Sequence, residues 1–218
     1  MTAQDPIRML LIIALAVAAR GEVIDRIAIT AESSVITESE LREAIRLTSF
    51  FNRTEPEYTP SKLREAGERL VDQLLLKQEQ VSSRFPEATR EDAVKLMETV
   101  IANYGSRAEF NTALAKYNLS EEQVLIALRR QLTTIRFINS RFGAGIRITQ
   151  EEIRDYYRTE WRARMPASEQ PPEEIPEEYR DVIESNLVQQ RAMQQAENWL
   201  RETRSRMAID FRPDVFLE

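Results

Sequence analysis

The sequence predicts a mainly helical protein with a small β-hairpin near its start, a strand near its end and a long closing helix. Most apolar residues recur at the 3.6-residue period of amphipathic helices. Helix starts are marked repeatedly by a Ser or Thr followed three positions later by an acid or an amide. Strand-like patterns are confined to residues 23–30, 34–37 and 208–211.

Composition excludes several classes of function. The chain has 218 residues with 30 basic and 36 acidic side chains, a net charge of −6, which argues against a nucleic-acid binder because phosphates are held by basic patches. It contains no His and no Cys, which excludes disulfides, thiolate and imidazole metal sites, and triads built on His or Cys. Only carboxylates, Lys, Tyr and Ser remain for catalysis. We expect neither a metal nor a cofactor, and we assign no catalytic residue.

The first residues are typical of an export signal. Residues 9–19 form an apolar run, MLLIIALAVAA, that follows Arg8 and contains small residues at Ala16 and Ala18. This run is shorter than the roughly 20 apolar residues of a membrane span. The alternative is a buried N-terminal helix. We predict that residues 1–20 are a signal peptide and that the protein is periplasmic or otherwise exported.

Residues 23–30 and 34–37 are rich in β-branched residues, and a polar turn at 31–33 separates them. This pattern predicts a small hairpin. With only five glycines in the chain, the Gly-rich loops that bind phosphate are missing.

Helical periodicity follows the hairpin. We predict helices over residues 38–51, 61–81, 90–104, 107–117, 121–142 and 150–165. Side chains that form or approximate a capping box precede five of them, at Thr37, Thr89, Ser106, Ser120 and Thr149. Pro60 marks the start of the remaining helix, because proline suits the first helical turn.

One segment breaks the helical pattern. Residues 166–176 (PASEQPPEEIP) contain four Pro and three Glu, and proline excludes a helix or strand interior. A long amphipathic pattern then covers residues 177–207, followed by the strand at 208–211. An isolated two-stranded hairpin is marginal in water, so we expect this strand to pair with it. The chain is thus divided into a core at 21–165, a linker at 166–176 and a closing segment at 177–218.

Three motifs in this order resemble a known family. Residues 36–41 read ITESEL, residues 148–157 read ITQEEIRDYY, and residues 199–209 read WLRETRSRMAI. Together they resemble the N-terminal chaperone region of the SurA family of periplasmic foldases, which is related to the PrsA and PpiD proteins. The resemblance covers nearly all of residues 22–212 and implies the helical chaperone fold, with residues 177–218 completing the domain.

The departures from the family are as informative. Its members usually carry parvulin prolyl-isomerase domains between the second and third motifs. Here only the linker at 166–176 occupies that place, far below the roughly 50 residues of a small domain. Parvulin sites also use His and a Gly-rich scaffold, which this chain lacks. The resemblance therefore implies the chaperone fold without isomerase activity.

The function that the resemblance implies is that of an exported, ATP-independent holdase. Its partners would be unfolded or partly folded exported proteins, with outer-membrane proteins as candidates, and neither nucleic acid nor a stable membrane span is expected. Such a protein needs exposed apolar surface rimmed by charge. The candidate client-binding residues are those that flank the break: Tyr156, Tyr157, Trp161 and Met165. The alternative for each is packing against the last helix.

Two other functions remain open at this point. One is a dedicated assembly partner of a single exported protein, which the breadth of clients would distinguish. The other is a carboxylate-based hydrolase that uses acid pairs such as Glu151 with Glu152, 173 with 174, or 177 with 178. Adjacent acids on a helix point in different directions, and acids at a helix N-terminus favour its dipole. The sequence therefore favours a structural role for these pairs.

Overall fold

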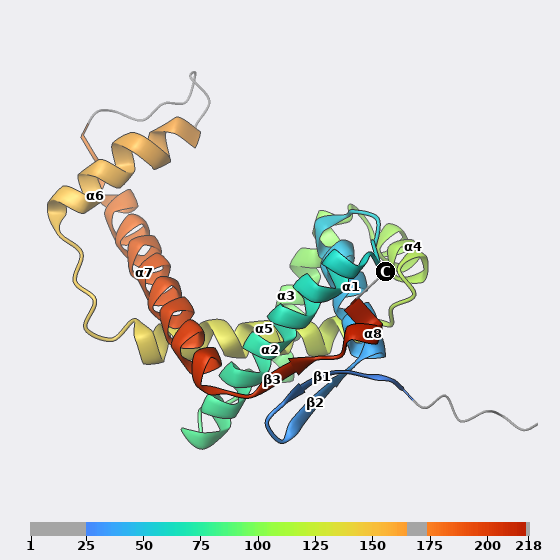
Figure 1. The fold of residues 1–218 in the computed structure, drawn as a ribbon. Coiled ribbons are helices and arrows are strands. Elements are labelled where there is room, and N and C mark those ends of the chain that lie inside the picture. Colours follow the sequence, from blue (N-terminus) through green and yellow to red (C-terminus); the bar gives the residue numbers. More distant parts are fainter. Residues whose placement is uncertain (1–24, 165–173, 217–218) are drawn as a thin grey trace, which may run out of the picture.

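The computed structural model describes residues 25–164 and 174–216, and the fold class is the mainly helical one that the sequence predicts. Figure 1 shows a small sheet beside a group of helices, and a long C-terminal helix that projects away from that group. The predicted export signal at 1–20, Met165 and most of the 166–176 linker lie outside the described residues.

The sheet joins the two ends of the chain. Strands β1 (Ile27–Ala31), β2 (Ser34–Thr37) and β3 (Ile209–Phe211) are all antiparallel, in the order β2-β1-β3. The predicted pairing of the C-terminal strand with the hairpin is therefore confirmed. The prediction of a strand from residue 23 was wrong at residues 25 and 26, since β1 begins at Ile27 and the Arg26 carbonyl oxygen accepts a hydrogen bond from the backbone N–H of Glu38 (2.8 Å), the first residue after β2.

The helices begin where the local caps predict. Their bounds are α1 Glu38–Asn52, α2 Pro60–Ser82, α3 Arg90–Asn103, α4 Arg107–Lys116, α5 Glu121–Phe142 and α6 Gln150–Tyr156. Complete capping boxes precede four of them, at Thr37, Thr89, Ser120 and Thr149. Ser106 caps α4 through its side chain alone, and Thr59 caps α2, in which Pro60 occupies the first turn. Each cap satisfies backbone N–H groups that have no partner inside the helix.

An aromatic cluster holds α1, α3, α4 and α5 together. The fully buried Phe50 lies at its centre, with the ring centroids of Phe51, Tyr104, Phe110 and Tyr117 all within 5.8 Å of its own. The Tyr104 hydroxyl donates to the Phe50 carbonyl oxygen (2.5 Å), which satisfies the polar end of a half-buried ring.

The sheet packs on α2 through a glycine. A Cβ atom at Gly67 would lie 2.6 Å from Cδ1 of Ile29 and 3.2 Å from Cε1 of Phe211. Because real side chains do not approach so closely, the absence of a side chain at residue 67 allows β1 and β3 to lie directly on this helix. The sequence did not predict the short helix α8 (Pro213–Phe216). Its Val215 and Phe216 side chains belong to the same buried cluster as Ile29.

The predicted single helix over 150–165 was wrong in its second half. Helix α6 ends at Tyr156 and is followed by a π-helical turn, η1 (Tyr157–Trp161), and a 3-10 turn, η2 (Arg162–Arg164). The wider π turn accompanies a contact with the long helix α7 (Glu177–Arg206), since the Trp161 ring centroid lies 5.7 Å from that of Tyr179.

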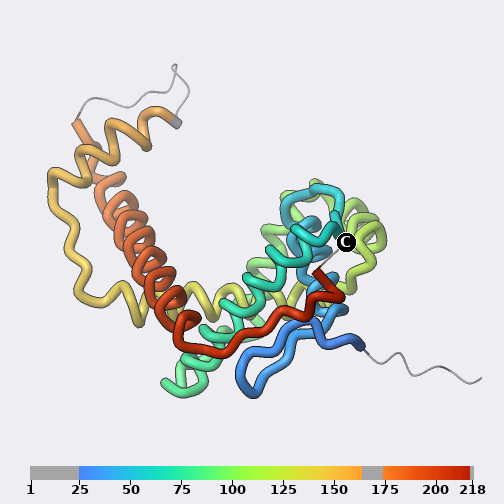
Figure 2. The backbone as a smooth tube through the Cα atoms, in the orientation of Figure 1, coloured from blue at the N-terminus to red at the C-terminus, as the bar shows by residue number. Residues whose placement is uncertain are grey.

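The long helix α7 (Glu177–Arg206) gives the molecule its angular shape. Figure 2 shows that its first half stands clear of the other helices, with only the segment around α6 beside it, while its second half returns to the base of the group. There the fully buried Ala192 packs with Leu76 of α2 and Phe137 of α5. We call residues 150–164 and 174–190 the arm, and residues 25–142 with 191–216 the body.

Candidate functional site

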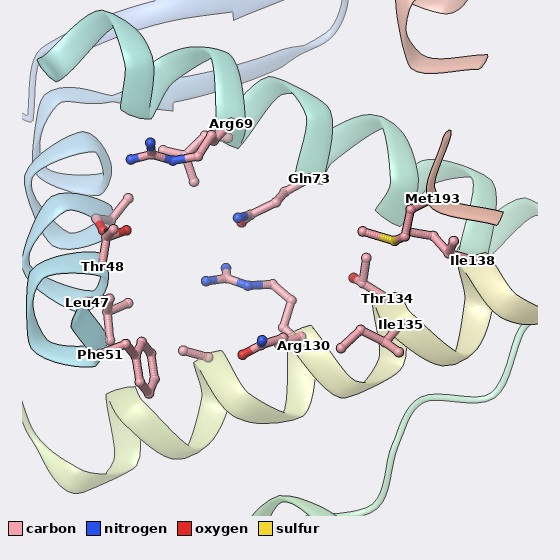
Figure 3. A pocket seen from close by; sticks show the side chains of 14 residues that line it. Leu47, Thr48, Phe51, Arg69, Gln73, Arg130, Thr134, Ile135, Ile138 and Met193 are labelled. Carbon is pink, nitrogen blue, oxygen red and sulfur yellow. The ribbon is translucent and has the colours of Figure 1, made fainter. Parts of the chain in front are cut away.

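An apolar hollow of the described residues lies between α1, α2 and α5. It has a volume of about 420 Å³, and Met193 of α7 closes one end (Figure 3). Its apolar lining residues are Ala44, Leu47, Phe51, Leu70, Ala127, Ile135, Ile138 and Met193. The Met193 side chain is 40 % exposed and Phe51 is half-buried, so part of this apolar surface is open to solvent.

The charged residues of this hollow are all basic. They are Arg69 and Arg130, and the remaining polar lining consists of Thr and Gln side chains. Figure 3 shows the guanidinium group of Arg130 reaching into the middle of the space, with the Gln73 amide directed toward it from α2. Arg69 is held by Glu65 (Nη1 to Oε1 2.6 Å), whereas Arg130 has no ion pair or hydrogen bond with any described residue.

Helical spacing places these residues on one face. On α5, Ala127, Arg130, Thr134 and Ile138 are three or four positions apart, so they share a stripe of the helix. The adjacent stripe of α5, which includes Val124 and Leu128, is buried in the aromatic cluster. The side chain of Ala127 is small, and α7 covers this stripe only at its Ile138 end, which leaves the hollow open.

Two further hollows adjoin the first one. Thr48 and Arg69 also border a hollow of about 270 Å³ between α1 and the start of α2. Met193 also borders a shallow hollow of about 450 Å³ along α7. Its lining consists mainly of amide side chains, with Tyr156 and Glu197 beside them. The amides are those of Asn186, Gln189, Gln190 and Gln194. Because they share lining residues, we call the three together the trough; it runs from α1 to the exposed face of α7.

The aromatic residues that the sequence singled out form the core of the arm. Tyr157 is fully buried and Tyr156 is 8 % exposed, and both pack with Ile183 of α7. Trp161 is half-buried beside Tyr179, and Met165 lies outside the described residues. Of the three that the structure describes, only Tyr156 borders the trough. The buried ring of Tyr157 cannot touch a ligand unless the arm opens, so its binding role stays a prediction.

The acids considered for hydrolysis lie in structural positions. Glu152 completes the capping box of α6 and pairs with Arg191 of α7. Hydrogen bonds from the Thr149 backbone N–H and from Arg191 lower the pKa of Glu152, which favours the charged carboxylate. A general acid requires the opposite shift. Glu151, Glu174, Glu177 and Glu178 are exposed, and residue 173 lies outside the described ranges.

The carboxyl group of Asp72 has a raised pKa. Burial raises the pKa of Asp72, opposed by the charge of Arg204 on α7, whose Nη1 lies 3.2 Å from Oδ1 of Asp72. Asp72 lines a hollow of about 370 Å³ with Glu197 and Arg201. Because Asp72 is engaged with Arg204, this arrangement fits an ion pair that ties α2 to α7.

Across 25–164 and 174–216, no group of three or more acidic side chains is placed to hold a metal ion. None of the helices in these ranges combines the length and hydropathy that crossing a bilayer requires.

Comparison with known proteins found no family model that matches the chain, and no curated protein that matches it. The candidate site therefore rests on the geometry above.

Sequence reasoning missed Arg130, Gln73 and Met193. Each belongs to a helical stripe whose other members are ordinary core or surface residues, so the stripe alone does not reveal a hollow. One signal was present in the sequence: amides recur every fourth residue of α7, at Asn186, Gln190, Gln194 and Asn198.

Proposed function

We propose that this chain is an exported, ATP-independent chaperone that holds unfolded or partly folded proteins in its trough. The observation that carries the proposal is the hollow between α1, α2 and α5, an apolar surface that reaches solvent at Met193. A concave, mostly apolar hollow of roughly this size is typical of ligand-binding sites.

The shape of the site fits a chain-like, variable ligand. A hydrophobic segment of a client can enter a recessed apolar surface and be shielded there. The flat apolar surface of a second copy of the protein cannot enter the recess. Met193 supports breadth of binding, because the unbranched, polarisable Met side chain adapts to ligands of different shape. The net charge of −6 supports solubility of the loaded complex.

The sequence adds support for location and for activity. The apolar run at residues 9–19 favours export, and the three motifs in their order favour a SurA-like chaperone region. Because only a short proline-rich segment stands where such proteins carry parvulin domains, the proposed chaperone does not catalyse prolyl isomerisation. Unaided isomerisation takes tens to hundreds of seconds, so catalysis by the pure protein would be easy to detect.

The proposal is tested by dilution of a urea-denatured outer-membrane protein into buffer without nucleotide, followed by light scattering. We expect the protein from residue 21 onward to suppress aggregation at near-stoichiometric ratios. Suppression of a single client and of no unrelated one would favour a dedicated assembly partner instead.

A matched pair of variants links the activity to the trough. Met193→Gln changes an apolar side chain of the trough, and Val182→Gln changes one on the same helix that is 45 % exposed and does not line the trough. We expect only Met193→Gln to weaken suppression. Equal effects of the two variants would contradict the proposed site, and no suppression by the unchanged protein would contradict the proposed function.

A further inference from the structure

We propose that the trough selects polypeptide segments in which an acidic side chain stands beside apolar ones, and that Arg130 receives the carboxylate. This inference rests on the proposed function, and it adds a specificity that the resemblance to a chaperone family does not carry.

The charged side chains that line the hollow are all basic. No acidic side chain lines the space into which Arg130 reaches, although acids outnumber bases in the chain. A neutral apolar ligand would displace water from the Arg130 guanidinium and offer no counter-charge, which is unfavourable. A carboxylate on the ligand replaces that water with a charge-assisted hydrogen bond. An acidic segment should therefore bind better than a neutral one, and a basic segment worse than either.

Arg130 differs in this from the other arginine of the hollow. The charge of Arg69 is already balanced by Glu65 of the same helix, at 2.6 Å. Arg130 has no partner among the residues that the structure describes. The discrimination between acidic and neutral ligands is therefore assigned to Arg130.

The length of the trough indicates the kind of ligand. A single alkyl carboxylate would need only the central hollow, but the trough continues past Met193 along α7. The amides Asn186, Gln190 and Gln194 follow one another every fourth residue there, which on a helix is a spacing of about 6 Å. Alternate residues of an extended chain repeat at roughly 6.6 Å. The two spacings are close enough for successive amides to meet every second peptide group.

These amides also have the chemistry that a peptide backbone requires. Each carries a donor and an acceptor, as a peptide group does, and only the Gln194 amide is already engaged, since it donates to Glu197 (3.3 Å) and Asn198 (3.5 Å) among the described residues. The side chains of Asn186 and Gln190 form no hydrogen bond with another described residue. Their donors and acceptors can therefore bond the backbone of a client of any sequence, whereas Arg130 binds one acidic side chain. We infer an extended polypeptide as the occupant.

The test uses three fluorescent peptides of about twelve residues. They share one apolar frame and differ only in a central Glu, Gln or Lys. Fluorescence anisotropy with the full-length protein from residue 21 onward gives the affinities. We expect the Glu peptide to bind about fivefold more tightly than the Gln peptide, and the Lys peptide to bind most weakly. The difference should shrink as the salt concentration rises.

Variants assign the effect to its residue. Arg130→Gln should remove the preference for Glu over Gln, and Arg130→Glu should reverse the order in favour of Lys. Arg154→Gln is the matched control, because Arg154 is also exposed and unpaired within the described residues but does not line the trough. It should leave the order unchanged. Asn186→Ala with Gln190→Ala should weaken all three peptides by the same factor.

The outcomes separate this inference from the proposed function. Equal binding of all three peptides to the unchanged protein, or a preference for Glu that survives Arg130→Gln, would overturn the selectivity while the holdase activity stands. Binding of decanoate that depends on Arg130, without binding of the peptides, would overturn the polypeptide ligand. Failure to bind any peptide, together with failure to suppress aggregation, would overturn both proposals.

Discussion

The body and the arm are stabilised in different ways. In the body, elements far apart in the sequence bury one another: Phe50 is surrounded by four aromatic rings, and Ile29 packs against Phe211 and Gly67. In the arm, α6 and η1 face only the first half of α7. Its buried cluster is small and consists of Ile153, Tyr156, Tyr157 and Ile183.

Polar side chains tie α6 and the segment before it to α7. Arg191 of α7 donates to the Arg147 carbonyl oxygen (2.9 Å) and pairs with Glu152, while Arg180 donates to the Gln150 side chain (2.7 Å). These bonds are partly exposed, so each contributes little to the free energy of unfolding. The comparison indicates a body that unfolds as one unit and an arm that can open locally. Met193 lies next to their junction, where a binding surface could adapt without loss of the body.

The largest effect is expected when the chain is ended at Pro176. This truncation removes α7, α8 and β3, which uncovers the β1 edge at Ile29 and the buried faces of Leu76 and Phe137. We expect the 21–176 fragment to lose cooperative unfolding or to become insoluble. Differential scanning calorimetry measures this. A soluble fragment that melts as sharply as the longer protein would show that the body does not need α7.

A matched pair of core substitutions compares the two regions directly. Phe50→Ala removes the centre of the aromatic cluster and should lower the free energy of unfolding by about 3–5 kcal/mol. Tyr157→Ala removes a ring that is equally buried in the arm. It should abolish hydrogen-exchange protection in α6 and leave that of α3 and α5 unchanged. If Tyr157→Ala destabilises α3 as much as Phe50→Ala does, the arm and the body form one cooperative unit.

Gly67→Ala should have a smaller effect, confined to the body. The new methyl group would meet Cδ1 of the fully buried Ile29 at 2.6 Å, and the resulting overpacking should outweigh the better helix propensity of Ala. We expect a net loss of about 1–2 kcal/mol in urea denaturation. Gln78→Ala, at an exposed position of the same helix, is the control and should be neutral or slightly stabilising. A stabilised Gly67→Ala protein would mean that the sheet can move away from α2.

The smallest effect is expected from Glu152, in the arm. Its pKa in the folded protein is lowered below the ordinary 4.5, so its stabilisation is fully present above that value and is lost as the pH falls through the lower folded value. Trp161 reports on the arm when Trp199 is replaced by Phe. We expect its fluorescence to show the arm loosening in acid before the body unfolds.

The Glu152→Gln variant is the control for this titration. Gln keeps the capping hydrogen bonds but lacks the charge that pairs with Arg191. It should show at neutral pH the Trp161 signal that the unchanged protein shows only in acid. An acid transition of the arm that is the same in both proteins would assign it to another group.

The sequence by itself determined most elements of this fold, with the exception of η1, η2 and α8. Helix starts at Thr37, Thr89, Ser120 and Thr149 were readable because a capping box joins residues only three positions apart. The alternation at Ile209 and Phe211 was sufficient to predict a strand. Its pairing with the N-terminal hairpin could also be predicted, because a two-stranded hairpin is too small to be stable alone. The absence of His and Cys likewise removed whole classes of chemistry at once.

Only the tertiary structure decided where a ligand could bind. The stripe through Ala127, Arg130 and Thr134 is an ordinary helical pattern, and it lines a hollow because α1 and α2 stand apart over it and Met193 arrives from the far end of the chain. The same packing turned Tyr157 from a candidate surface residue into the core of the arm. A cap depends on neighbours in sequence, but a cavity depends on the angles between helices, which are set by contacts between residues far apart in the chain.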